Sequence, residues 1–216
     1  MEKIIASIKD ILVARWPQIL DGTLGHIQLT LIALFFAVLI AVPLGIFLTR
    51  HRKFADPIIG VTSVFQTIPS LALLGFMIPI LGIGKVPAVV ALTIYGLLPI
   101  LRNTYTGIIG VDKGVIEAGV GMGMTSRQIL FMIEIPMALS VIMAGVRTAS
   151  VLIVGVGTLA SLIGAGGLGD LIFRGIATAT TSLILAGAVP AAILALTFDY
   201  VLKSIEFKVT PRGLKK

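Results

Sequence analysis

The sequence has no cysteine and few charged residues, and each scarcity narrows what the protein can be. Without cysteine, the chain has no disulfide framework and no thiol site, and its redox compartment stays open. Charged residues make up 12% of the chain, against 57% hydrophobic residues and a mean hydropathy of +1.09, and such values are typical of membrane proteins. The two histidines, His26 and His51, stand alone, and no carboxylate cluster has the spacing of metal ligands. We therefore expect neither a catalytic centre nor a metal site.

The charges that are present are mostly basic, with a formal net charge of +7. Such an excess can indicate nucleic-acid binding, but here the basic residues lie between apolar runs and do not gather on one polar face. A bias of positive charge toward one membrane leaflet explains the pattern better. No nucleic-acid partner is therefore expected.

Five apolar runs are compared with the roughly 20 residues that a helix needs to cross the hydrocarbon core. They cover about 24–48, 57–81, 86–101, 137–163 and 181–202. The sequence therefore predicts an all-α membrane protein of the cell membrane, with five transmembrane helices in residues 23–203 and a basic tail at 204–216. Residues 1–22 place apolar side chains at helical spacing between charges and carry Trp16, which suits the headgroup level, so they predict an interfacial amphipathic helix.

The basic residues also predict which side of the membrane each loop occupies. They follow the first, third and fifth runs, and the set comprises Arg50, Arg52, Lys53, Arg102, Lys113, Arg127, Lys203, Lys208, Arg212, Lys215 and Lys216. The positive-inside rule assigns these segments to the cytoplasm. The N-terminus is then outside, the C-terminus is cytoplasmic, and the segment at about 112–136 faces the cytoplasm.

The segment 112–136 is polar and interrupted by glycines in a chain that is otherwise apolar. Asp112 is suited to cap a short helix, and Thr125 with Gln128 has the spacing of a capping box that starts a second one. Pro136 is expected to end this second helix. The residues alone allow two interpretations: an insert that binds a partner outside the lipid, or an amphipathic helix that lies on the membrane surface.

A spaced pattern within this segment carries a resemblance. It reads Glu117-Ala118-Gly119, three residues, Gly123, nine residues, then Ile133-Glu134-Ile135-Pro136. This resembles the EAA loop of ABC importer permeases, usually written EAA-x(3)-G-x(9)-I-x-L-P, with Gly119 in place of the third-position Ala and Ile135 in place of Leu. In that family the loop is a cytoplasmic coupling helix that docks into a groove on the ATPase subunit, and the resemblance implies a type I ABC importer permease fold. The residues to which it assigns the coupling role are Glu117, Ala118, Gly119, Gly123, Ile133 and Pro136, and we call residues 112–136 the coupling loop.

The resemblance extends over nearly the whole chain. Segments that resemble the permeases of osmoprotectant importers, which take up glycine betaine, carnitine and choline, are 26–30, 42–45, 66–72, 97–107, 144–148, 164–169 and 196–200. Methionine-importer permeases share the glycine-rich turn and five spans, so the permease of a methionine or other amino-acid importer is the alternative. A secondary transporter is a further alternative, which five runs and one internal charge fit poorly.

The resemblance also implies partners. These are a second permease chain, identical or different, two cytoplasmic ATPase subunits that bind ATP and Mg²⁺, and an external substrate-binding protein. The chain itself is expected to be a transport subunit without enzyme activity or bound cofactor. Aromatic residues make up only 6% of the chain, so it is not an obvious place for an aromatic cage around a quaternary ammonium. Substrate selectivity is therefore expected mainly in the binding protein.

Helix breakers lie near the middle of the second run, at Gln66, Thr67, Pro69 and Ser70. Lipid tolerates freed backbone groups only where protein or a water-filled cavity satisfies them. These residues therefore indicate either the lining of a transport pathway or a plain packed kink.

Two further features lie in or after the fourth run. Arg147 is a basic residue well inside it, and it is either a functional charge, a charge that reaches the inner face, or the partner of a carboxylate such as Asp199. The glycine-rich segment 164–169 follows no strand and precedes no phosphate-binding lysine. It predicts a tight turn whose backbone approaches a neighbour closely.

Overall fold

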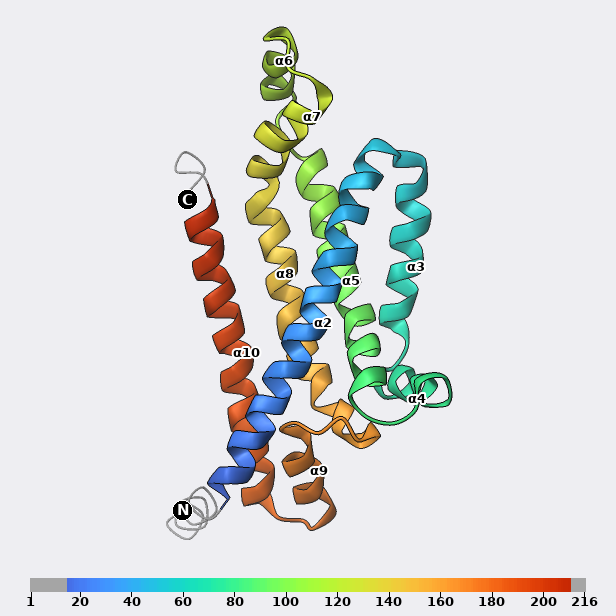
Figure 1. The fold of residues 1–216 in the computed structure, drawn as a ribbon, viewed down its shortest axis with the longest axis vertical. Helices are drawn as coiled ribbons and strands as arrows, with labels where there is room; N and C mark the ends of the chain where they lie inside the picture. Colours follow the sequence, from blue (N-terminus) through green and yellow to red (C-terminus); the bar gives the residue numbers. More distant parts are fainter. Residues whose placement is uncertain (1–14, 211–216) are drawn as a thin grey trace.

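The computed structural model describes residues 15–210, and every regular element in that part of the chain is helical (Figure 1). Three short turns of other helical types lie at Arg52–Phe54 and Leu159–Ile163, which are 3-10, and at Leu130–Glu134, which is π. The α-helices are α2 (Trp16–Arg50), α3 (Ala55–Thr67), α4 (Ser70–Leu81), α5 (Lys85–Ile109), α6 (Lys113–Gly121), α7 (Ser126–Ile129), α8 (Ile135–Gly157), α9 (Gly169–Ala177) and α10 (Thr181–Val209).

Four stretches of helix within the described residues are long and apolar enough to cross a membrane: α2, α5, Ser126–Gly157 and α10. The predicted run at 57–81 is a bent pair instead, because α3 and α4 meet at 98°. The bend follows from Pro69, whose ring disfavours helical backbone at the preceding residue, and Ile68 accordingly is extended with ψ 128°. The structure therefore contains four such spans, or five if the bent pair counts as one.

The core lies where α5 packs against α2 and α8. Small residues let these helices approach closely, as is usual in membranes. On α2 the buried set recurs every four residues and comprises Ala33, Ala37, Ala41 and Gly45. A Cβ on Gly96 of α5 would meet Ala37 at 3.0 Å, and one on Gly145 of α8 would meet Asn103 at 2.7 Å. The glycines are therefore required by helix packing.

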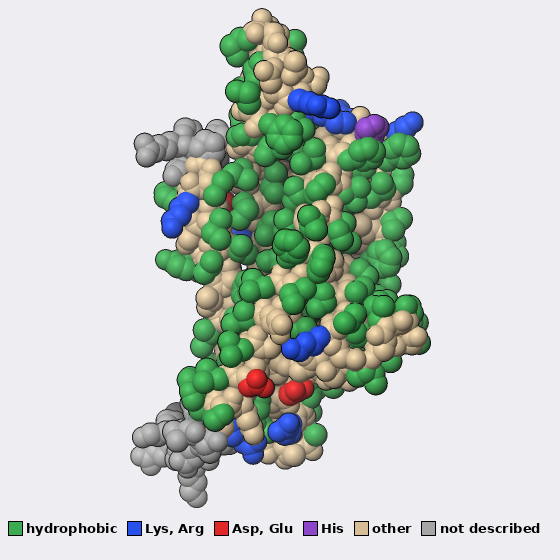
Figure 2. Space-filling view, viewed as in Figure 1, with side chains coloured by type: hydrophobic (Ala, Val, Ile, Leu, Met, Phe, Trp, Pro, Cys, Tyr) green, Lys and Arg blue, Asp and Glu red, His purple; other side chains and the backbone are tan. Residues whose placement is uncertain are grey.

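The two ends of the molecule are built differently (Figure 1). One end carries the start of α2, the glycine-rich turn and α9, and the other carries α6, α7 and the end of α10. The coupling loop and the C-terminal end of α10 thus lie at the same end, and the start of α2 lies at the opposite one. Figure 2 shows that hydrophobic side chains cover most of the middle of one face.

The predicted interfacial helix falls mostly on residues 1–14, which lie outside the described residues. Its last part, from Trp16 onward, forms the first turns of α2, with Pro17 where a proline suits a helix start. No break therefore separates this part from the first span. At the other end, α10 continues to Val209, and the last six residues of the basic tail lie outside the described residues.

Candidate coupling loop and helix break

Side-chain caps define the two short helices of the coupling loop. Asp112 accepts hydrogen bonds from the amides of Gly114 at 2.7 Å and Val115 at 3.3 Å, which caps α6. The Thr125 amide donates to Gln128 Oε1 at 2.8 Å, while the Gln128 amide donates to Thr125 Oγ1 at 3.4 Å. This is a complete capping box at the start of α7. Both predicted helix starts are confirmed.

The six residues of the EAA-like pattern differ in exposure, and two of them, Ile133 and Pro136, are half-buried. Glu117, Ala118 and Gly123 lie on the surface, and Gly123 has a φ of +79° that favours glycine. Gly119 is buried, and a Cβ there would lie 2.8 Å from Ile133 Cδ1. The glycine at the third position therefore lets α6 pack closely on the helix that follows it.

The prediction that Pro136 ends the helix is wrong. Helix continues from Ser126 to Gly157, and Pro136 lies in the first turn of α8. The π turn Leu130–Glu134 precedes it and interrupts ordinary α-helical hydrogen bonding. A proline is tolerated in the first turn of a helix, where its missing N–H has the least consequence.

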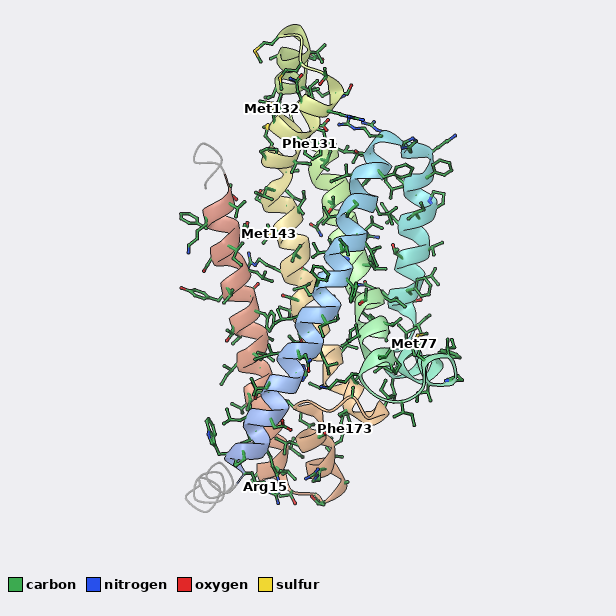
Figure 3. The ribbon with its side chains drawn as sticks, in the orientation of Figure 1. Arg15, Met77, Phe131, Met132, Met143 and Phe173 are labelled. Atoms are coloured by element: carbon green, nitrogen blue, oxygen red, sulfur yellow. The ribbon has the colours of Figure 1, made fainter. Side chains whose placement is uncertain are left out.

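The loop end exposes large apolar side chains. Met122 is 74% exposed, Phe131 is 66% exposed and Met132 is 67% exposed. Figure 3 shows the last two on the coupling loop, beside α7. These apolar side chains accompany polar, capped helices, so the coupling loop is amphipathic.

At the break between α3 and α4, Tyr95 of α5 satisfies freed groups. Gln66 Nε2 donates to the Tyr95 carbonyl at 3.2 Å, and the Tyr95 hydroxyl donates to the Ile68 carbonyl. Beside this lies a cavity of 330 Å³, whose lining is Gln66, Thr67, Ile68, Pro69, Ser70, Tyr95, Leu152 and Val156. All four residues predicted at the break thus line one cavity. Sequence reasoning missed Tyr95, because nothing in its own run relates it to a break 27 residues away.

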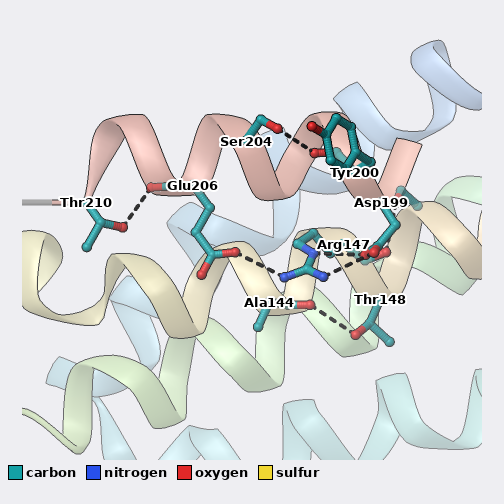
Figure 4. A network of polar contacts seen from close by, with 9 residues as sticks. Ala144, Arg147, Thr148, Asp199, Tyr200, Ser204, Glu206 and Thr210 are labelled. Atoms are coloured by element: carbon teal, nitrogen blue, oxygen red, sulfur yellow. Dashed lines mark hydrogen bonds and ion pairs between the residues drawn. The ribbon is translucent and has the colours of Figure 1, made fainter. Parts of the chain in front are cut away.

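Arg147 makes a network with two carboxylates of α10 (Figure 4). Its Nε lies 2.9 Å from Asp199 Oδ1 and its Nη2 lies 3.1 Å from Asp199 Oδ2, which is a bidentate pair. Its Nη1 lies 3.3 Å from Glu206 Oε2. Sequence reasoning named Asp199 but missed Glu206, which is seven residues further on and therefore on the same helix face.

A second cavity, of 460 Å³, lies beside this network. Ala144, Arg147, Thr148, Val151, Leu152 and Asp199 line it. Leu152 borders both cavities, so the helix break and the charged network lie along one face of α8. Within residues 15–210, no three His, Asp or Glu side chains gather as metal ligands.

The glycine-rich turn packs closely on its neighbours, as predicted. Gly164, Gly166 and Gly167 have positive φ, and the Gly84 amide donates to the Ile163 carbonyl at 2.8 Å. A Cβ on Gly169 would overlap the Thr158 carbonyl oxygen.

One side chain at this end is fully enclosed. His26 of α2 is buried against the turn, with Nε2 3.0 Å from the Val154 carbonyl oxygen. A Cβ on Gly167 would lie 3.2 Å from His26 Nδ1, so the turn leaves little room there for a larger residue. The Asp170 carboxyl lies exposed beside the turn, where partial desolvation raises its pKa and Arg174 opposes this shift.

Comparisons with known proteins identify the family of the chain. The family model of binding-protein-dependent transport system inner membrane components matches residues 41–212. The chain is 53% identical over 199 residues to the choline transport system permease protein OpuBB of Bacillus subtilis (strain 168), with 92% of each chain covered. It is 51% identical over 198 residues to the carnitine transport permease protein OpuCB of Listeria monocytogenes, covering 92% of this chain and 91% of that one.

A solved structure gives the same result for the fold. A chain of the MetNI methionine ABC transporter in an inward-facing conformation superposes with a TM-score of 0.82 at 25% identity, covering 92% of this chain and 99% of that one. The predicted type of fold, that of an ABC importer permease, is thus confirmed. The protein is a multi-pass membrane protein, and it belongs to the family of binding-protein-dependent transport system inner membrane components.

Proposed function

We propose that the protein is the permease subunit of an ATP-driven importer for quaternary ammonium osmoprotectants such as glycine betaine, carnitine and choline. The observation that carries the proposal is the identity of 51–53% over 92% of the chain to permeases named for choline, for glycine betaine/carnitine/choline, and for carnitine. The protein's own role is transport. ATP, with Mg²⁺, is bound and hydrolysed on a partner subunit.

The coupling loop is the docking element for that ATPase. In support, its helices are held by side-chain caps, and its end exposes Met122, Phe131 and Met132 to a partner. Glu117 lies exposed on the same projection and supplies the negative charge with which a basic residue of the ATPase pairs. The packing of Gly119 on Ile133 joins α6 to the helix of the fourth span, so a push on the loop moves that span.

The complete transporter contains two permease chains, identical or different, two cytoplasmic ATPase subunits and an external binding protein. The N-terminus is outside, the C-terminus and coupling loop are cytoplasmic, and the bent pair α3–α4 counts as the second of five spans. The positive-inside bias of the loops supports this orientation. Closure of the ATPase dimer brings the two coupling loops together and rocks the spans between outward and inward access.

The transport pathway follows the face of α8 that borders both cavities. Gln66, Thr67, Pro69 and Ser70 contribute at the helix break, and the network of Arg147 with Asp199 contributes nearer the cytoplasmic end. Backbone bent away from regular helix inside a membrane protein is expected where it lines such a cavity. Aromatic residues make up only 6% of the chain and offer no evident cage for a quaternary ammonium, so selectivity resides mainly in the binding protein.

A methionine importer is the alternative substrate class, and one observation favours it. The solved structure that superposes well is a methionine transporter. Its identity of 25% is about half that of the osmoprotectant permeases, so the quaternary ammonium class has the stronger support.

The test is uptake of labelled glycine betaine into vesicles that contain the permease, its ATPase and its binding protein. We expect uptake to require ATP and to be lost in Glu117→Lys, and excess unlabelled choline to compete better than excess methionine. Asp56→Lys is the matched control, because it makes the same charge change at an exposed residue near the same end but outside the loop. Uptake without ATP, or normal uptake by Glu117→Lys, would contradict the proposal.

A further inference from the structure

One ion pair joins the end of α2 to the base of the coupling loop. Arg50 is the last residue of α2, and its guanidinium contacts both carboxylate oxygens of Glu134. Nη1 lies 3.3 Å from Oε1, and Nη2 donates to Oε2. The two residues are 84 positions apart in the chain. A bidentate pair of this kind fixes orientation as well as distance, so it holds two distant segments in one arrangement.

The two partners are unequally exposed. The Glu134 side chain is 6% exposed, whereas that of Arg50 is 42% exposed. A carboxylate removed from water depends on its partner, because breaking the pair leaves an uncompensated buried charge. The contact is therefore under stronger constraint than an ordinary surface ion pair.

Glu134 also ends the π turn Leu130–Glu134, which connects α7 to α8. The π turn and the missing N–H of Pro136 both weaken ordinary helical hydrogen bonding here. Gly119 of α6 packs on Ile133 in the same turn. Arg50 therefore braces, from a separate helix, the segment on which the coupling loop stands.

The other end of α2 is held as well. Near its start, the His26 ring is enclosed by Gly157 and by Gly167 of the glycine-rich turn. Between these two ends, α2 packs along α5 and α8. A helix held at both ends passes a displacement of one end to the other through packed side chains.

We propose that Arg50 and Glu134 are positioning residues that make the coupling loop and α2 move as one unit. The inference rests on the proposed function. When the ATPase displaces the loop, the pair carries the displacement into α2 and on to the glycine-rich turn at the opposite end. Without the pair the loop still docks and ATP is still hydrolysed, but less of the motion reaches the spans. The quantity that reports this is the amount of substrate transported per ATP hydrolysed.

The test uses the assembled transporter in proteoliposomes, with uptake and ATP hydrolysis measured on the same preparation. The variants are Arg50→Glu, Glu134→Arg and their double exchange, with Arg50→Gln and Glu134→Gln as neutral forms should a reversed charge prevent assembly. We expect each single variant to lower the transport per ATP about tenfold. The double exchange is expected to return the ratio to within about twofold of wild type.

Arg52→Glu is the matched control, since Arg52 is an exposed neighbour that forms no ion pair among the described residues. It should leave the ratio unchanged. A purely structural role for the pair would lower assembly and both rates together and keep their ratio, which would overturn the proposal. Neutral variants that transport as much substrate per ATP as wild type would also overturn the proposal. So would a double exchange that assembles but still transports less substrate per ATP.

A second readout does not depend on the substrate. The chain has no cysteine, so a spin label can be placed at one site, at exposed Leu24 on α2. Binding of an ATP analogue should change the distance between the labels of the two permeases in wild type, and Arg50→Gln should abolish that change. An unaltered change in Arg50→Gln would overturn the proposal. Absence of glycine betaine uptake in wild type would instead count against the proposed substrate, and the label distance would still decide the role of the pair.

Discussion

Glycine is concentrated at both ends of the molecule, but the two ends use it for opposite purposes. At the coupling loop, no atom of residues 15–210 lies within 4 Å of where a Cβ on Gly121 or Gly123 would be. At the other end, a Cβ on Gly169 would overlap backbone, and one on Gly187 would lie 2.7 Å from the Leu168 carbonyl oxygen. Around Gly121 and Gly123 the backbone therefore has free space, whereas at Gly169 and Gly187 neighbouring backbone fills that space.

This difference separates the residues that determine stability from those that determine function. At the packed end, a larger side chain forces the backbone to move, because protein interiors have few voids. An open end absorbs substitutions locally and keeps its surface available to a partner. The same type of residue in the same kind of cluster thus predicts loss of folding at one end and loss of coupling at the other.

The largest effect is expected at Gly169. In Gly169→Ala the new methyl group overlaps the Thr158 carbonyl oxygen, so the backbone must move, and we expect a loss of about 3 kcal/mol in the free energy of unfolding. The measurement is thermal unfolding of the purified protein in detergent. Gly155→Ala is the control, since a Cβ there meets nothing within 4 Å. Equal stability of the two variants would contradict the contrast between the ends.

Two glycines with positive φ allow backbone strain to be separated from packing. Gly123→Ala and Gly167→Ala both place a Cβ in left-handed backbone, at φ +79° and +91°, which costs about 1–2 kcal/mol. Only Gly167 is also crowded, with His26 Nδ1 at 3.2 Å from the new atom. We expect Gly167→Ala to lower the unfolding temperature more than Gly123→Ala, and the reverse order would refute the packing argument.

A smaller and local effect is expected at the capping box. Thr125→Ala removes the acceptor of the Gln128 amide and should destabilise α7 by about 1 kcal/mol. Amide hydrogen exchange should become faster in residues 126–129 while that of α5 stays unchanged. Thr125→Ser keeps the cap and serves as the control. Faster exchange throughout the spans would show that the loop is not an independently opening unit.

The smallest effect is expected at Gly121, the last residue of α6. With open space around it and no positive φ, Gly121→Ala should change the free energy of unfolding by less than about 0.5 kcal/mol. Thermal unfolding beside wild type measures this. A large loss would mean that the coupling loop is as tightly packed as the turn.

Features governed by neighbouring residues were accessible from the sequence. Asp112 and Thr125 start helices through contacts two or three residues away, and the glycine turn is a matter of local backbone. The bend at Pro69 could be expected in place but not in angle, because the residues around Pro69 carry no information on how the two helices pack against the rest of the chain. The continuation of the helix past Pro136 was missed, because no sequence pattern predicts the π turn that precedes it.

Contacts between distant segments could mostly not be predicted from the sequence. The pairing of Arg147 with Asp199 was one of three alternatives that the sequence allowed, because few charges lie inside the runs and each needs a partner. Arg50 with Glu134 was not, because both lie near polar loops where water could satisfy them equally well. Only the folded arrangement shows that Glu134 is buried.

The shortness of α3 has a consequence for hydration. Its 13 residues rise about 20 Å at about 1.5 Å per residue, less than the roughly 30 Å of a hydrocarbon core. Since α4 turns away by 98°, the end of α3 lies within the depth of the lipid tails when its start is at the surface. The adjoining cavity then lies at that depth beside the Ile68 and Tyr95 carbonyls, and the protein's own donors, the Tyr95 hydroxyl and Gln66 Nε2, satisfy these carbonyls without water.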